Sequence, residues 1–263
     1  MKWIYILPVM FVLAACGDSE DDEEVQPSEA MEVLYNRAAD TFSKQEYKSA
    51  IEEFEEVERQ HPYSDWATKA QVMAAFSAYK AAEFDDAVDI IDRFVKLHPT
   101  HPSAAYAYYL KALCYYIQIT DVGRDQSKTE DARKALKEVI ARYPDSDYAK
   151  DAKLKLDLTE DHLAGKEMEI GRYYLKQQQY LAAINRFKSV VDNYQTTSHA
   201  AEALHRLVEC YVSLGVMKEA KRYAAVLGYN YPGSEWYQFS YKLMKGNLSP
   251  EERESIFDKY LAL

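Results

Sequence analysis

A single spacing recurs five times along this chain of 263 residues. In each copy a small residue is followed, twelve positions later, by a residue placed where a helix would end. The small residues are Ala50, Ala87, Ala132, Ala183 and Ala220, and the residues twelve positions on are Pro62, Pro99, Pro144, Gln195 and Pro232. Proline closes a helix because it lacks the amide hydrogen and disfavours a helical conformation in the residue before it. Five copies in one phase predict a solenoid of stacked helix pairs.

A second set of small residues marks the partner helix in four of the pairs. These residues are Ala38, Ala75, Ala112 and Gly171. Small side chains on both helices allow a close approach, which is typical of the tetratricopeptide repeat (TPR). We therefore predict an all-α TPR solenoid of five helix pairs.

The helix ends also show where the repeat is interrupted. They lie 37, 45, 51 and 37 residues apart. The first excess falls around residues 119–126, which contain Asp121, Gly123 and Asp125, and it predicts a loop inside repeat three. The second excess lacks glycine and proline between Asp145 and Ala164, so it predicts one elongated first helix in repeat four, from about 147 to 177.

These interruptions suggest how the folded part is divided. Residues 29–146 would form an N-terminal TPR block of repeats one to three, and residues 147–248 a C-terminal TPR block of repeats four and five. Residues 249–263 begin Ser-Pro-Glu-Glu, which predicts a capping helix. Cys114 and Cys210 occupy equivalent positions two repeats apart, too far for a disulfide, so we expect both to be packing residues.

The N-terminus has the pattern of a secretory signal. A basic Lys2 precedes an apolar run over residues 3–12 that is too short to span a bilayer, and Leu-Ala-Ala-Cys ends at Cys16. This resembles the lipobox of bacterial lipoproteins, so residues 1–15 would be a signal peptide and Cys16 would carry a diacylglycerol and an N-acyl chain. The alternative is a soluble secreted protein in which Cys16 is incidental.

The residues after the cysteine predict a tether and a destination. Residues 16–28 are strongly acidic and would stay extended and solvated. Gly17 stands where an inner-membrane retention aspartate would lie, so we expect the periplasmic face of the outer membrane. The net charge of -11 argues against nucleic acid as a partner.

In a TPR array the first helices line a concave groove at fixed positions. In repeats one to three those positions hold Tyr35, Phe42, Phe76, Tyr79, Lys80, Tyr106, Tyr109 and Tyr116. In repeats four and five they hold the more polar set Met168, Arg172, His205 and Glu209. An aromatic groove suits an extended peptide, because rings offer apolar area and phenols offer a hydrogen bond. The alternative is that these rings simply pack between helices.

Catalytic and metal-binding patterns are missing from the sequence. It contains no His-Glu-x-x-His, Gly-x-Ser-x-Gly, phosphate-loop or Cys-x-x-Cys motif, and no cofactor or metal site is expected. The chain is therefore expected not to be an enzyme. A cell-wall enzyme carrying TPRs would need a catalytic domain, for which no residues remain.

Two adjacent segments carry a family resemblance. Residues 91–102 read Ile-Asp-Arg-Phe-Val-Lys-Leu-His-Pro-Thr-His-Pro and residues 106–113 read Tyr-Ala-Tyr-Tyr-Leu-Lys-Ala-Leu. Together with the lipobox and the repeat pattern, they closely resemble the BamD family of lipoproteins, which belong to the β-barrel assembly machinery (BAM complex). The resemblance implies a non-catalytic adaptor on the outer membrane.

The resemblance also implies partners and sites. The N-terminal repeats would bind the aromatic-ended signals of unfolded outer-membrane proteins, and the C-terminal repeats would dock to the POTRA domain of BamA, alongside other BAM lipoproteins. The docking role falls on Asn185 and Arg186, where residues 182–187 match the family's surroundings. An ordinary surface charge is the alternative for Arg186. A TPR pilotin lipoprotein that targets a secretin is the alternative for the whole chain, although its repeats would be uninterrupted.

Overall fold

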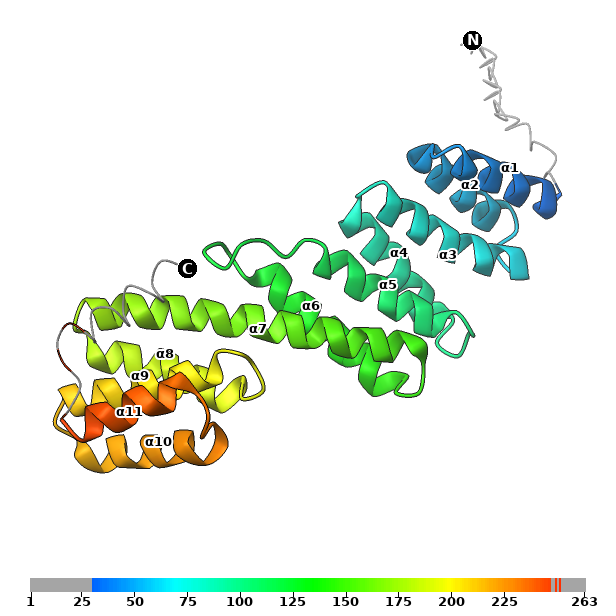
Figure 1. The fold of residues 1–263 in the computed structure, drawn as a ribbon. Helices are drawn as coiled ribbons and strands as arrows, with labels where there is room; N and C mark the ends of the chain where they lie inside the picture. The colour runs from blue at the N-terminus through cyan, green and yellow to red at the C-terminus, as the bar shows by residue number, and fades with distance from the viewer. Residues whose placement is uncertain (1–29, 247–248, 250, 252–263) are drawn as a thin grey trace, which may run out of the picture.

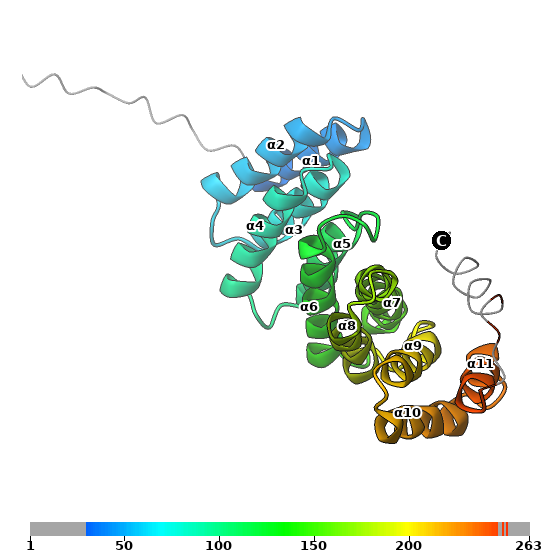
Figure 2. The same cartoon turned by 90° about the vertical axis from the view of Figure 1, so that its left-hand side faces the viewer.

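The computed structural model describes residues 30–246, 249 and 251, all of whose regular elements are helices (Figure 1). Five helix pairs follow one another along an elongated, curved array (Figure 2). The first helices are α1 (Met31–Ser43), α3 (Asp65–Lys80), α5 (Ala104–Tyr116), α7 (Asp147–Lys176) and α9 (Ala200–Ser213). The second helices are α2 (Tyr47–Gln60), α4 (Phe84–Leu97), α6 (Ser127–Arg142), α8 (Tyr180–Asn193) and α10 (Met217–Asn230). The predicted all-α solenoid of five pairs is confirmed.

Both predicted interruptions of the repeat are present. Helix α7 has 30 residues, twice the length of most of its neighbours, and matches the predicted elongated helix. A loop over residues 117–126 joins α5 to α6. The other four pairs are joined by a tight turn with one residue at positive φ, namely Gln45, Ala82, Gln178 and Gly215. The longer loop of repeat three replaces that turn.

Small residues let the helices of a pair approach closely, as predicted. Ala38, Ala75 and Ala112 are buried. Gly171 of α7 lies against Phe187 of α8, and a Cβ atom built on it would meet that ring at 2.5 Å. The glycine is therefore required by the packing of the long helix on its partner.

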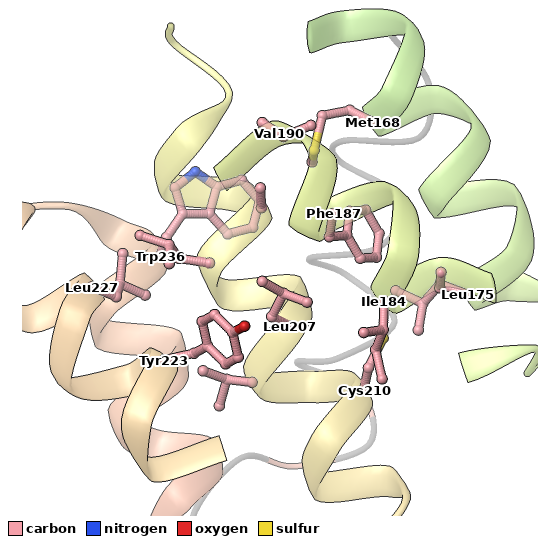
Figure 3. Packing of buried hydrophobic residues seen from close by; sticks show 14 of the residues in the cluster. Met168, Leu175, Ile184, Phe187, Val190, Leu207, Cys210, Tyr223, Leu227 and Trp236 are labelled. Carbon is pink, nitrogen blue, oxygen red and sulfur yellow. The ribbon is translucent and has the colours of Figure 1, made fainter. Parts of the chain in front are cut away.

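The buried hydrophobic residues fall into three clusters. One is formed by residues of α1 to α5, and a small one by residues of α5, α6 and α7. The largest is formed by the second half of α7 together with α8 to α11 (Figure 3). Cys114 and Cys210 are buried in the first and last of these as free thiols, as predicted, and burial raises the pKa of each thiol to about 12. The proposed block boundaries remain a prediction.

An eleventh helix, α11 (Glu235–Met244), was not predicted. It begins after Ser234, whose hydroxyl accepts a hydrogen bond from the Tyr237 amide at 3.2 Å. Ser64 and Ser146 cap α3 and α7 in the same way.

Four sequence predictions concern parts of the chain that the structure covers little or not at all. The signal peptide, Cys16 and the acidic tether lie outside the described residues, and so does the capping helix predicted at 249–263 apart from Ser249 and Glu251. Within the described residues, no helix has the length and apolar character needed to cross a membrane.

Candidate functional site

Aromatic rings from four successive first helices form one continuous row. Ring centroids lie 5.6 Å apart between Phe42 and Phe76, 6.4 Å between Phe76 and Tyr106, and 5.7 Å between Tyr106 and Tyr148. Tyr79 stacks on Phe76 at 6.3 Å, and Tyr109 lies 5.3 Å from Tyr148. We call these six residues the aromatic row: Phe42, Phe76, Tyr79, Tyr106, Tyr109 and Tyr148.

Five of the eight predicted groove residues belong to this row, and the other three lie elsewhere. Tyr35 packs between helices, 4.8 Å from Trp66 and 5.5 Å from Phe54. Lys80 is exposed and lies 5.8 Å from the Tyr47 ring, and Tyr116 has the Lys155 ammonium 5.6 Å from its ring. The alternative of packing between helices therefore describes Tyr35 better.

Tyr148 is the member of the row that the repeat positions do not include. It stands in the first turn of α7, two residues after the capping Ser146. Trp66 likewise stands two residues after Ser64, and Trp236 two residues after Ser234. All three belong to a recurring sequence pattern, Pro-x-Ser-acidic-aromatic. Each of these three rings contacts the preceding first helix, at Tyr35, Tyr106 or His205. The pattern could therefore have identified Tyr148.

Two phenols of the row, Tyr106 and Tyr109, have a raised pKa and stay protonated at neutral pH. Burial raises the pKa of Tyr106 to about 12. The pKa of Tyr109 is raised by burial and by its hydrogen bond to the Asp151 carboxylate. The row therefore presents partly buried rings together with phenol hydroxyls, which suit a peptide with aromatic side chains.

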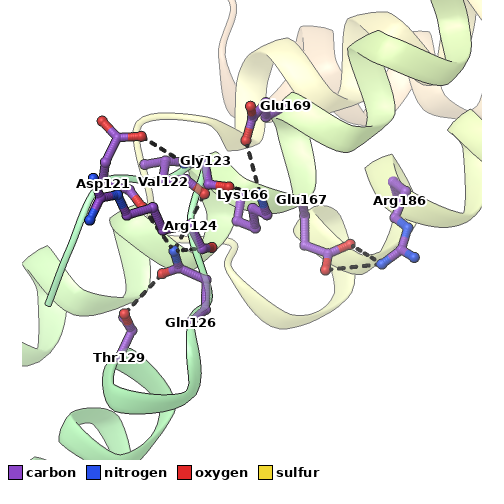
Figure 4. A network of polar contacts seen from close by, with 10 residues as sticks. All are labelled: Asp121, Val122, Gly123, Arg124, Gln126, Thr129, Lys166, Glu167, Glu169 and Arg186. Carbon is purple, nitrogen blue, oxygen red and sulfur yellow. Dashed lines mark hydrogen bonds and ion pairs between the residues drawn. The ribbon is translucent and has the colours of Figure 1, made fainter.

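Arg186 of α8 lies on another part of the surface. Its Nη1 atom donates to both carboxylate oxygens of Glu167 on α7, each at 3.3 Å (Figure 4). The Arg186 side chain is 42% exposed, and Tyr174, Asn185 and Ser189 line the shallow hollow beside it. Glu167 thus holds the guanidinium in place while much of it remains open to a partner.

The four groove positions of the C-terminal pairs, which the sequence predicted to be more polar, are divided between the core and partly buried sites. Met168 and His205 are buried, and α11 covers the inner side of α9. His205 Nδ1 lies 2.8 Å from the Ser240 hydroxyl, and its ring lies 5.3 Å from Trp236. His205 is buried because α11, a helix that the repeat pattern did not predict, packs on it, whereas Arg172 and Glu209 remain partly buried polar residues.

The buried His205 makes stability depend on pH. Burial, and then the charge of Arg206, hold the His205 pKa well below 6.5. Below pH 6.5 the unfolded chain therefore binds a proton that the folded chain does not. The contribution of His205 to the free energy of unfolding is fully present above pH 6.5 and decreases below it, by up to about 1.4 kcal/mol per pH unit. We expect His205→Asn to reduce that slope between pH 6.5 and 5, as measured by urea unfolding. An unchanged slope would contradict this role, and the exposed-face variant Lys221→Asn serves as control.

Comparison with known proteins gives one consistent family. Residues 27–227 match the YfiO family, described as "Outer membrane lipoprotein". The chain is 48% identical to the outer membrane protein assembly factor BamD of Caulobacter vibrioides, covering 92% of this chain and 79% of that protein. It is also 48% identical to BamD of Rickettsia prowazekii, covering 91% and 95%, and 32% identical to BamD of Neisseria gonorrhoeae, covering 89% and 92%.

Proposed function

The chain belongs to the BamD family of outer-membrane lipoproteins, and from that premise we propose an adaptor that binds unfolded clients at one end and docks to a barrel subunit at the other. It is an assembly factor of the outer membrane and not an enzyme, as the sequence predicted. The family assignment favours this function over the pilotin alternative. Cys16 is the proposed site of the lipid anchor, on the periplasmic face.

The aromatic row is the proposed client site, and its continuity is the observation that supports it best. Four helices contribute rings to one surface, so an extended segment could meet several rings in succession. Aromatic contacts contribute about 0.5–1.5 kcal/mol each beyond the area that they bury. Several weak contacts along the row would thus add to useful affinity for an aromatic-ended signal peptide.

The docking face is proposed at Arg186 and Asn185, for the POTRA domain of BamA. Asn185 is exposed and Arg186 half-exposed, and they are adjacent on α8. A positioned guanidinium suits a carboxylate on the partner, because it can donate two parallel hydrogen bonds. Other lipoproteins of the complex would bind elsewhere on the chain.

Replacing two central rings tests the client site. We expect Phe76→Leu with Tyr106→Leu to weaken binding of a labelled peptide that ends in phenylalanine by about tenfold or more, because the stacking contacts are lost while apolar side chains remain. Fluorescence anisotropy measures the affinity. Tyr63→Ala, which removes a fully exposed ring in a turn, is the control and should bind as the natural chain does. Equal affinity in the double variant would refute the aromatic row as the client site.

A further inference from the structure

One face of α7 connects the aromatic row to the middle of the molecule. The residues of this face alternate three and four positions apart, a spacing that stays on one side of a helix for several turns. They are Tyr148, Asp151, Lys155, Leu158, His162, Gly165, Glu169 and Arg172. The first three contact α5, through Tyr109 and Tyr116.

The remaining residues of that face line a cavity of about 560 Å³, which we call the central cavity. Asp121, Val122 and Gly123 of the loop after α5 form another wall, and His199 before α9 contributes to it. Lys166 fastens the loop to α7 by donating to the Gly123 carbonyl at 3.1 Å (Figure 4). Helix α7, and α5 with the loop that follows it, therefore contribute residues both to the aromatic row and to the central cavity.

The charges that line the central cavity are unbalanced. Asp121, Asp161 and Glu169 contribute three carboxylates, of which Glu169 is paired with the Lys166 ammonium at 3.2 Å. The one guanidinium among the described lining residues, Arg172, is already held by two hydrogen bonds to Glu202, at 3.0 and 2.7 Å. Burial lowers the pKa of His199, which keeps its imidazole neutral near pH 7. The cavity therefore favours a cation.

The carboxylates that line the cavity can accept further hydrogen bonds from such a cation. Asp161 accepts hydrogen bonds from Ser198, and Glu169 accepts one from Lys166 at 3.2 Å, so each carboxylate keeps further lone pairs. His162 Nε2 is buried and has no hydrogen-bond partner among the described residues. Leu158 is 61% exposed and can cover the methylene groups of a long side chain.

We infer that the central cavity receives an arginine or lysine of the same client segment whose aromatic end lies on the aromatic row, which rests on the proposed client function. Tyr148 and His162 are 14 positions apart on one helix, or about 21 Å at 1.5 Å per residue. An extended peptide covers that distance in roughly six residues at about 3.3 Å each. The basic residue should therefore lie about six positions before the aromatic one.

Labelled peptides that share one phenylalanine end test this inference by fluorescence anisotropy. The peptides carry arginine, glutamine or glutamate six positions before the phenylalanine, and a fourth carries arginine only three positions before it. We expect the six-position arginine peptide to bind about tenfold more tightly than the glutamate peptide, and the three-position peptide to lose the advantage. Glu169→Gln should reduce the tenfold ratio to about threefold or less. Asp157→Asn, on the exposed side of the same helix, should leave the ratio unchanged.

The outcomes separate this inference from the proposed function. If the arginine and glutamate peptides bind equally while Phe76→Leu with Tyr106→Leu still weakens both, the client site stands and the central cavity is not used. A preference for arginine that persists in Glu169→Gln would also overturn the assignment to this cavity. If none of the peptides binds the natural chain, both the client site and the inference are wrong. Circular dichroism melting of each variant confirms that the fold is retained.

Discussion

Arg186→Glu is expected to abolish capture of the large barrel subunit from solubilised envelope. The substitution removes the guanidinium that we propose as the docking contact and faces the partner's carboxylate with a like charge. Losing one partner of a hydrogen-bonded charge pair at an interface costs about 2–5 kcal/mol, and a reversal costs more. The affinity should therefore fall at least about a hundredfold. Affinity capture followed by mass spectrometry measures the loss.

A charge swap distinguishes docking from a structural role of the same arginine. Arg186→Glu also places two carboxylates where Arg186 and Glu167 now pair at 3.3 Å. Combining it with Glu167→Arg restores an ion pair between α7 and α8 but not the guanidinium on α8. If the double variant regains the barrel subunit, Arg186 acts through its internal pair and the docking proposal fails. Lys221→Glu on α10 is a control of equal charge change.

The elements that the sequence predicted well are those set by local chemistry. Prolines and small residues in fixed phase marked the helix pairs, and the absence of glycine and proline after Asp145 marked the long α7. These features depend on a residue and its near neighbours along the chain, so no knowledge of tertiary contacts was needed.

The features that were missed depend on residues far apart in the sequence. Tyr148 joins the aromatic row because α7 begins beside Tyr106 and Tyr109. Helix α11 packs on α9, where Ser240 lies within hydrogen-bond distance of His205. The pattern Pro-x-Ser-acidic-aromatic marks both helix starts, yet it does not say which earlier ring each aromatic will contact. Tyr35 shows the converse, since it holds a groove position but packs on Trp66.

The central cavity illustrates the same limit for a site. Its lining comes from α7, the loop after α5 and the residue before α9, and the sequence predicted the first two as separate interruptions of the repeat. Tertiary contacts, among them the hydrogen bond from Lys166 to the Gly123 carbonyl, make them one site. An insertion that looks like an irregularity in a repeat can thus supply the wall of a cavity.

The strongest stability prediction concerns a buried ion network between α7 and α9. Glu202 accepts hydrogen bonds from Arg172 and from Arg206 Nε, the latter at 3.3 Å. Arg206 is 1% exposed, donates to Glu209 at 3.0 Å and lies 5.5 Å from the Trp236 ring of α11. One carboxylate therefore binds two guanidinium groups where α7 contacts α9, close to Trp236 of α11.

Glu202→Ala should destabilise the C-terminal pairs by about 3–5 kcal/mol, because removing one partner of a buried ion pair leaves its charge uncompensated in a poorly solvating site. Urea unfolding measures the change, with Trp66→Phe as the background in a chain without residues 1–15, which contain Trp3, so that Trp236 reports on this part of the chain. Glu219→Ala removes a carboxylate whose partner, Arg222, is largely exposed, and should cost less than about 1 kcal/mol. Should Glu202→Ala cost no more than that control, Glu209 and Trp236 would suffice to stabilise Arg206, and Glu202 would serve chiefly to orient Arg172 at the edge of the central cavity.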